Sequence, residues 1–338
     1  MTTIKDIAKV AGVSVTTVSR AINGYSDVSE KTRQKIMKLV KELNYSPNTL
    51  ARGLVMNKSK TIGLLVSGLN RESEKDQITF SVLSGINECA SELDYDLVLF
   101  NTNSTKQREK TYTQLCRERR VDGAIIQGIK TDDPYLQEVV NSDIPCVLID
   151  YPIQSENVGH VTTDNKLGAK KAVNHLIELG HKNIAMINGH SKAFVSQIRL
   201  EGYLDALQEA GLTYKKEWVV NGMFEEETGK EQVIKLLKKY PEITAVFSAS
   251  DLMALGILEG AKEIGRKVPE DLSVVGYDDI LLAGYSNPPL TTISQNIFQL
   301  GYQAANLLIK MLEGTLEPHV ITLGTKLVVR ESTAKNHK

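Results

Sequence analysis

Residues 3–23 read TIKDIAKVAGVSVTTVSRAIN and predict two short helices joined by a tight turn. Thr3 and Asp6 have the spacing of a capping box, which supplies acceptors to the free amides of a first helical turn. One buried stripe is expected along the first helix, formed by Ile4, Ile7, Ala8 and Ala11. Gly12 permits the bend, and Ser14 is a natural N-cap for the second helix. This is the layout of a helix-turn-helix, whose second helix enters the major groove of DNA.

The charge of the chain is divided unequally. Residues 1–60 hold 11 Lys and Arg against 4 Asp and Glu, a balance of +7, whereas the whole chain carries −1. The other 278 residues therefore carry −8. A basic head on an acidic body indicates a polyanionic partner at one end only, because Lys and Arg neutralise phosphates. The alternative is a basic helical domain whose charged surface faces solvent and does not bind the major groove of DNA.

The bulk properties indicate a globular protein of the cytoplasm. A chain of 338 residues suits two or three units, and 41% hydrophobic and 24% charged residues are ordinary values. No apolar run approaches the roughly 20 residues of a membrane span, and the N-terminus has no apolar signal core. Cys89, Cys116 and Cys146 are scattered and odd in number, which argues against a disulfide framework and fits a reducing compartment.

After the first two helices, the pattern predicts a third helix from Ser29 to about Leu43, which the sequence NYSP closes. We expect a helix-turn-helix domain over residues 1–46 and a hinge with a short helix over 47–60. Beyond residue 60, strand-like runs alternate with amphipathic stretches, as in doubly wound α/β sheets. The strands expected are 61–67, 95–101, 122–127, 144–150, 183–188, 244–249 and 273–277. The helices expected are 77–93, 107–119, 165–179, 196–210, 226–240, 252–264 and 296–313.

These alternating strands and helices are too many for a single sheet, so residues 61–338 are expected to form two lobes. We place lobe 1 at about 61–161 and 291–320, and lobe 2 at about 162–290 and 321–332. Crossings between them are expected near Thr162–Asp164 and Pro288–Pro289. Ligands of open parallel sheets bind beyond the carboxyl ends of the strands. Polar residues at those ends should face a cleft, namely Ser67, Asp150, Ser250, Asp251, Asp278 and Asp279.

These segments together resemble the LacI/GalR family of bacterial transcription regulators. The resemblance rests on the head and on the sequences YSPNTLARGL, RRVDGAII, LGHKNIAMI, DLMALG and VPEDLSVVGYDD. It implies a helix-turn-helix head, a hinge helix and a two-lobed core like that of periplasmic sugar-binding proteins. It also implies a homodimer that binds a near-palindromic double-stranded DNA operator and represses sugar-utilisation genes under the control of a small sugar.

The resemblance also implies which residues contact DNA. Val15, Thr16 and Arg20 should read base edges, and Thr17 and Ser19 should touch phosphates. Leu54 corresponds to an apolar wedge that enters the minor groove and kinks the duplex. Val15 could instead extend the buried stripe of its helix, and Leu54 could pack between lobes. The full DNA-binding set is Ser14, Val15, Thr16, Thr17, Ser19, Arg20, Asn23, Asn48, Ala51, Arg52 and Leu54.

For the effector, the resemblance points to Arg199 and Asp278 as partners of sugar hydroxyls and to Phe224 as an aromatic face. Weaker candidates are Ser67, Asp150, Asn165, Ser250 and Gln295. Each has an ordinary alternative: Asp278 or Ser250 could cap a helix, Arg199 could pair with a surface acid, and Phe224 could be core. The long loop 68–77 and residues 191–195 resemble maltose-type regulators, which suggests maltose or another α-glucoside.

Other readings stay open on the sequence alone. A global carbon catabolite regulator would use a phosphorylated protein corepressor, but Gln299 and Asn306 replace an acid and an arginine expected on that surface. A sugar-binding protein without DNA function would lack this head. An enzyme would need a motif that is missing, such as a phosphate loop or a nucleophile elbow. No cofactor and no metal site are expected, and the absence of a C-terminal leucine heptad favours a dimer.

Overall fold

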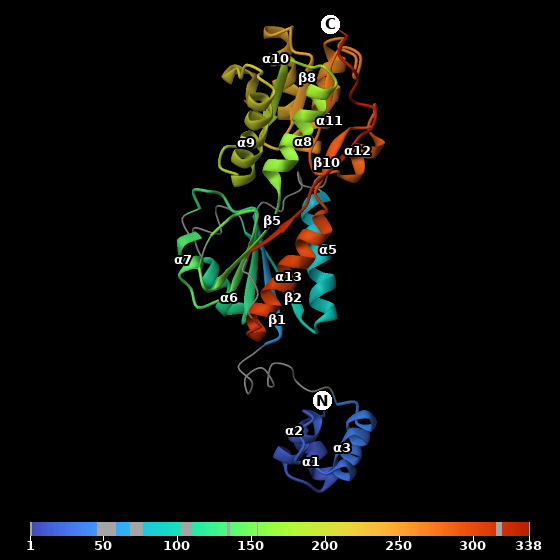
Figure 1. The fold of residues 1–338 in the computed structure, drawn as a ribbon. Helices are drawn as coiled ribbons and strands as arrows, with labels where there is room; N and C mark the ends of the chain where they lie inside the picture. Colours follow the sequence, from blue (N-terminus) through green and yellow to red (C-terminus); the bar gives the residue numbers. More distant parts are fainter. Residues whose placement is uncertain are drawn as a thin grey trace. The chain divides into compact units, whose positions relative to one another are not determined.

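The computed structural model describes residues 2–45, 59–67, 77–102, 110–133, 136–153, 155–315 and 320–337. Two compact units are present: the head, up to Ser59, and the core, from Lys60 onward. Figure 1 shows the elements of each unit. The predicted hinge helix, and with it Asn48, Ala51, Arg52 and Leu54, lies outside the described residues.

Capping geometry fixes the helices of the head, which are α1 (Ile4–Ala11), α2 (Val15–Ile22) and α3 (Glu30–Glu42). The Thr3 hydroxyl accepts from the Asp6 amide while the Asp6 carboxylate accepts from the Thr3 amide, so the predicted capping box is present. Gly12 ends α1 at a φ of 68°, a conformation that side chains with a Cβ disfavour. Ile7, Val18 and Ile36 are fully buried and join the helices in one small core.

The first lobe of the core is built on a six-stranded parallel sheet in the order β11-β5-β4-β3-β1-β2. Helices α5 and α13 pack together on the sheet (Figure 1). The strands are β1 (Thr61–Ser67), β2 (Asp96–Thr102), β3 (Gly123–Gln127), β4 (Cys146–Ile149), β5 (Val158–Thr163) and β11 (Val320–Leu323). The helices are α5 (Gln77–Glu92), α6 (Tyr112–Arg119), α7 (Leu136–Val140) and α13 (Ile297–Glu313).

The second lobe has a four-stranded parallel sheet in the order β7-β6-β8-β9. Helix α8 packs on α9, and α10 packs on α11. A small antiparallel pair, β10 with β12, joins this lobe through bridges from Val275 to Thr291 and from Asp278 to Ser294. The strands are β6 (Ile184–Asn188), β7 (Val219–Asn221), β8 (Ala245–Ser248), β9 (Ser273–Val275), β10 (Thr292–Ser294) and β12 (Lys326–Val328). The helices are α8 (Asn165–Glu178), α9 (Phe194–Glu209), α10 (Glu226–Lys239), α11 (Asp251–Glu263) and α12 (Leu281–Tyr285), with a 3₁₀ turn at Lys216–Trp218.

The predicted fold class is confirmed: a helix-turn-helix head is followed along the chain by two lobes with parallel sheets. Two lobe assignments need correction. Residues 292–294 pair within the second lobe, whereas the sequence placed them in the first. Strand β11, at 320–323, lies in the sheet of the first lobe, whereas residues from 321 on were placed in the second. Both errors concern short strands whose partners lie far away in the sequence, and such pairing leaves little trace in local periodicity.

The chain crosses between the lobes beside these strands, and hydrogen bonds hold the crossings together. The Thr163 hydroxyl donates to Gln295 Oε1 at 2.8 Å, and the Asp164 amide donates to the Leu323 carbonyl at 2.9 Å. The first crossing falls where the sequence predicted it. The second follows β10, several residues after Pro288–Pro289, and the third lies between β11 and β12.

Candidate functional site

The outer face of α2 carries the side chains that were predicted to meet DNA. The Ser14 hydroxyl accepts from the Thr17 amide at 3.0 Å and so starts the helix. Val15 is 40% exposed while Val18 is fully buried, so Val15 does not belong to the buried stripe. The other predicted contacts in the described head are exposed at Ser14, Thr16, Arg20 and Asn23 and half-buried at Thr17 and Ser19.

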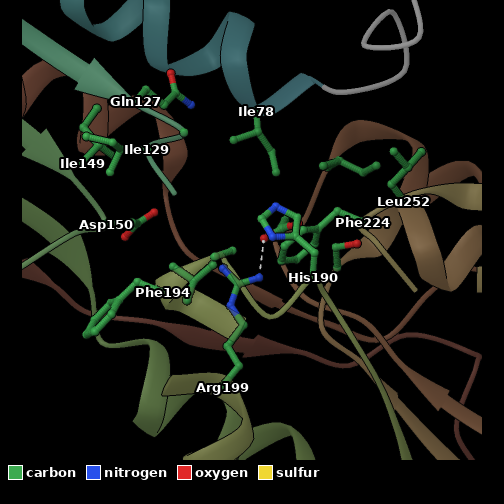
Figure 2. A pocket seen from close by; sticks show the side chains of 16 residues that line it. Ile78, Gln127, Ile129, Ile149, Asp150, His190, Phe194, Arg199, Phe224 and Leu252 are labelled. Atoms are coloured by element: carbon green, nitrogen blue, oxygen red, sulfur yellow. Dashed lines mark ion pairs between the residues drawn. The ribbon is translucent and has the colours of Figure 1, made fainter. Parts of the chain in front are cut away.

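A cavity of about 260 Å³ lies between the lobes of the core, where the carboxyl ends of both parallel sheets meet (Figure 2). Five of the predicted effector residues line it, namely Asp150, Arg199, Phe224, Ser250 and Asp278. Most of the remaining wall is apolar and comes from both lobes, through Ile78, Ile129, Ile149, Phe194, Leu252 and Ile280. The cavity therefore offers a few fixed polar groups inside a largely apolar enclosure, as small-molecule sites do.

Arg199 and Asp278 form a buried ion pair in the wall of this cavity. Arg199 Nη1 lies 3.5 Å from Asp278 Oδ1, and the two side chains are 4% and 2% exposed. Figure 2 shows the guanidinium directed from α9 into the cavity. In the described part of the core, the acid paired with Arg199 is the buried Asp278, and the neighbouring helices α11 and α12 have Ser250 and Ile280 as their N-caps, so neither alternative raised for these residues holds there. A guanidinium and a carboxylate so placed can bind vicinal hydroxyls or a polar ring edge.

Asn165 and Gln295 do not line the cavity, although both were predicted to contact the effector. Instead, each holds one member of the ion pair. Arg199 Nε donates to Asn165 Oδ1 at 2.9 Å, and Gln295 Nε2 donates to Asp278 Oδ1 at 2.5 Å. Their role in the structure is to orient Arg199 and Asp278. Ser67 ends β1, and its side chain lies outside the described residues.

Ser250 has two roles in the structure. It lines the cavity, and its hydroxyl also caps α11 by accepting from the Met253 amide at 3.3 Å. The neighbouring Asp251 does not reach the cavity, because its carboxylate accepts from the Thr292 hydroxyl and from the Ile280 amide. Complete burial, together with the nearby Asp278, raises the pKa of the Asp251 carboxyl well above its usual range.

Three of the lining residues have left-handed backbones: Asp150 at a φ of 60°, Phe224 at 63° and Asp278 at 115°. Side chains with a Cβ seldom adopt such angles, and residues that do so gather at binding and catalytic sites. Close packing also places the Phe224 ring, because a Cβ at Gly189 would lie 1.9 Å from Phe224 Cζ. The site is thus held in a conformation that the chain does not favour locally.

Sequence reasoning missed two polar residues of the cavity, Gln127 and His190. Gln127 ends β3, and His190 follows β6 by two residues, so the rule used for Asp150 and Ser250 would have found both. His190 meets the Phe224 ring edge-on at a centroid distance of 5.6 Å. Burial, with Lys130 and Lys192 nearby, lowers the pKa of His190, so its imidazole is neutral at pH 7.

The head and the second half of the core each match a known family. Residues 3–48 match the bacterial regulatory proteins of the lacI family, and residues 173–333 match the periplasmic binding protein-like domain. The HTH-type transcriptional repressor PurR of Histophilus somni is 37% identical over 98% of this chain and 99% of its own length. The PurR of Vibrio vulnificus is 36% identical over 99% of each chain. The chain belongs to the LacI family.

Solved structures of transcriptional regulators share this fold over nearly the whole chain. The lac repressor dimer bound to operator and the anti-inducer ONPF has a TM-score of 0.85 at 30% identity and covers 98% of this chain and 99% of that chain. A complex of the transcriptional regulator CelR with cellobiose has a TM-score of 0.77 at 34% identity and covers 98% and 100%. The protein is therefore a DNA-binding, ligand-responsive transcriptional repressor, and its relatives are repressors and not enzymes. Among the described residues, no helix is long and apolar enough to cross a membrane.

Proposed function

We propose that this LacI-family protein represses sugar-utilisation genes in the cytoplasm and that a small sugar in the core cavity controls its operator affinity. The observation that carries the proposal is the buried pair of Arg199 and Asp278 beside the Phe224 ring. A sugar ring presents adjacent hydroxyls at its edge and C–H groups on its face. The pair suits the hydroxyls, and the ring suits the face.

A disaccharide is the ligand that we favour, with maltose or another α-glucoside first. The cavity of about 260 Å³ lies just below the range of small-molecule sites, about 300 to 1,000 Å³. The similar CelR structure holds cellobiose, a disaccharide with a β-linkage. The relatives named PurR make purine bases the competing class, since an apolar slot with a guanidinium and a carboxylate can also hold a flat polar ring.

On the DNA side, we propose that α2 reads the major groove. Val15, Thr16 and Arg20 contact base edges, while Ser14, Thr17, Ser19 and Asn23 fix the register on the phosphates. In the hinge, Leu54 enters the minor groove, supported by Asn48, Ala51 and Arg52. Two heads of a homodimer meet the two half-sites of a near-palindromic operator.

Control by the ligand requires that the ligand prefers one arrangement of the two lobes. Both lobes contribute to the cavity wall, Ile129 and Asp150 from the first and Arg199 and Phe224 from the second. A bound sugar therefore gains its full set of contacts in one arrangement only, and it shifts the population toward that arrangement. The change in operator affinity can be no larger than the difference in ligand-binding free energy between the two arrangements allows.

A ligand panel tests the effector class. We expect maltose to raise the melting temperature of the purified protein and to bind with measurable heat in calorimetry, because a ligand of the folded state stabilises it. The panel contains maltose, cellobiose, lactose, glucose and two purine bases, hypoxanthine and guanine. Binding by a purine base alone would overturn the sugar assignment. Binding by cellobiose and not maltose would keep the disaccharide and reject the α-linkage.

A pair of arginine variants tests the site. Arg199→Ala should abolish the effect of the ligand on operator affinity while unliganded DNA binding persists. Arg117→Ala is the matched control, since Arg117 is 65% exposed and pairs with Asp143 on the surface. Leu54→Ala should weaken operator binding more than binding to a random duplex. Circular dichroism of each variant checks folding. If Arg199→Ala unfolds, Phe224→Leu replaces it as the variant that tests the effector cavity.

A further inference from the structure

The guanidinium of Arg20 is held in place within the head before any DNA is present. Arg20 Nε lies 3.0 Å from Asp27 Oδ2, and the guanidinium carbon lies 5.3 Å from the centroid of the Tyr25 ring. The side chains of Arg20 and Asp27 are 48% and 50% exposed, so the pair stands at the surface of the head. The long arginine side chain thus has two partners that restrict its rotamers.

The loop that carries these partners is itself anchored. The Tyr25 amide donates to the Arg20 carbonyl at 3.0 Å, and Arg33 Nη2 donates to the Tyr25 carbonyl at 2.6 Å. Val28 is buried in the core of the head, one residue after Asp27. Asp27 therefore lies in an anchored segment between α2 and α3, and from there its carboxylate reaches Arg20.

The ion pair engages one edge of the guanidinium and leaves its end available. Asp27 contacts Nε, and within residues 2–45 the two Nη groups of Arg20 form no hydrogen bond. Guanine presents O6 and N7 side by side in the major groove, and the two Nη groups of an arginine can donate to both. A carboxylate held at Nε leaves both Nη groups available for such a contact.

Whereas the position of Asp27 favours the contact of Arg20 with a base, its negative charge lowers the affinity of the head for DNA of any sequence. A carboxylate close to the duplex repels phosphates, and phosphate contacts supply most of the affinity for any sequence. A free Arg20 would add to that affinity by pairing with phosphates of every site. An Arg20 that is already paired with Asp27 has less to gain from a phosphate and keeps its fork for a base.

We propose that Asp27 is a positioning residue that presents Arg20 to a guanine of the operator and increases selectivity at the cost of non-specific affinity. The proposal rests on the proposed role of Arg20 as a reader of base edges. It predicts two effects of opposite sign when the carboxylate is removed. Discrimination at one base-pair position of each half-site falls, and binding to unrelated DNA rises.

The test uses full-length Asp27→Asn, which keeps the shape of the side chain and removes its charge. Binding-site selection from a randomised inverted repeat measures the base preference at each position, and titration with a random duplex measures non-specific affinity. We expect the preference for guanine at one position to fall at least about threefold, part of what a bidentate arginine contributes. The affinity for the random duplex should rise about two- to fivefold at low salt, and this gain should shrink as salt is added.

Glu42→Gln is the matched control. Glu42 also belongs to the head, but it pairs with Lys38 and not with Arg20. Loss of its charge should leave every base preference unchanged. Asp27→Glu retains the carboxylate on a longer side chain and should restore most of the guanine preference. A variant that only loosened the head would weaken specific and non-specific binding together.

Arg20→Ala separates this inference from the function on which it rests. If Arg20→Ala left all base preferences unchanged, Arg20 would not read a base, and the proposed role would fail. If Arg20→Ala removed one preference while Asp27→Asn kept it, the role of Arg20 would stand and the positioning role of Asp27 would be wrong. Asp27→Ser provides the same test if the asparagine variant melts below the assay temperature.

Discussion

The guanidinium of Arg199 stacks on the ring of Tyr277, with 3.8 Å between its carbon and the ring centroid. Arg199 Nη1 donates to the Ala249 carbonyl, and Nε donates to Asn165. The Tyr277 ring against one face and the two acceptors at the edge together fix the orientation of the guanidinium plane. A ligand that enters the cavity meets an arginine already in place, so little conformational entropy is lost when it binds.

Arg199→Lys should therefore weaken ligand binding almost as much as removal of the side chain. Lysine keeps the positive charge next to Asp278 but has neither the planar fork nor the stacking surface of arginine. We expect the ligand Kd to rise at least about tenfold, a change of about 1.4 kcal/mol, with operator affinity in the absence of ligand unchanged. Isothermal titration calorimetry measures the first quantity and fluorescence anisotropy the second. Wild-type ligand affinity in the lysine variant would contradict the importance of the fork.

Gly189→Ala should damage the site without a change of any polar group. Its Cβ would lie 1.9 Å from Phe224 Cζ, so the ring must leave its place in the cavity wall. Overpacking of this kind costs about 1 to 3 kcal/mol of stability, and we also expect about a tenfold loss of ligand affinity. Gly284→Ala is the control, because a Cβ at Gly284 meets no atom within 4 Å. Equal melting temperatures and equal ligand affinities for the two variants would refute the argument.

The ion pair between Lys192 and Asp132, which joins the two lobes at 2.5 Å, should contribute little. Both side chains are more than half exposed, and exposed pairs are weakened by hydration and salt. The Thr131 amide, which donates to the Lys192 carbonyl at 2.9 Å, joins the lobes at the same place without a side chain. Lys192→Ala should raise the ligand Kd no more than about threefold, and the difference should vanish at about 1 M salt. Isothermal titration calorimetry at low and high salt measures the Kd. A tenfold rise would show that the ion pair contributes more than its exposure allows.

The core should lose stability below about pH 6.5, in part because of His181. Its Nδ1 contacts the Thr244 hydroxyl, its Nε2 contacts the Ser273 hydroxyl and the Ala334 carbonyl, and burial lowers the pKa of His181. The folded state therefore binds a proton less readily than the unfolded state. The stabilisation is complete above the unfolded pKa of about 6.5 and is lost as the pH falls toward the folded value.

His181→Gln isolates this contribution, because the buried Asp251 titrates with the opposite sign in both proteins. Urea unfolding at several pH values between 5 and 8 gives the two stability curves. The variant should be less stable at pH 8 but should show a shallower fall toward pH 5. Parallel curves would mean that the protonation of His181 is not linked to folding.

The elements of the head could be predicted from sequence because their determinants are local. The Thr3 and Asp6 capping box, the left-handed Gly12 and the Ser14 cap each act on a residue no more than four positions away. The exposure of Val15 was not decided by the same pattern. An apolar residue at the start of α2 fits a buried stripe and a DNA-facing surface equally well, and only the packing of three helices separates them.

In the core, the sequence led to Arg199 through the family resemblance and to Asp278 at a strand end, but it failed for residues that act through others. Arg199 and Asp278 lie in the cavity as expected. Asn165 and Gln295 have the same polar character, but they turn away from the cavity and toward these two residues. That difference depends on the hydrogen bonds between the crossings, which join residues 163 and 295, and no local pattern reports a contact over such a separation.

The sheet of the first lobe contains both β1, at Thr61–Ser67, and β11, at Val320–Leu323, so its edge strand is among the last parts of the core to be synthesised. A nascent chain that has reached residue 300 already contains the whole head but lacks a complete sheet in the first lobe. Ribosome stalling or premature termination in that window would release a polypeptide with an intact helix-turn-helix and no finished effector site. Such a fragment would lack one strand of the sheet that carries the first-lobe wall of the cavity, so the late position of β11 makes the response to a ligand depend on completed translation.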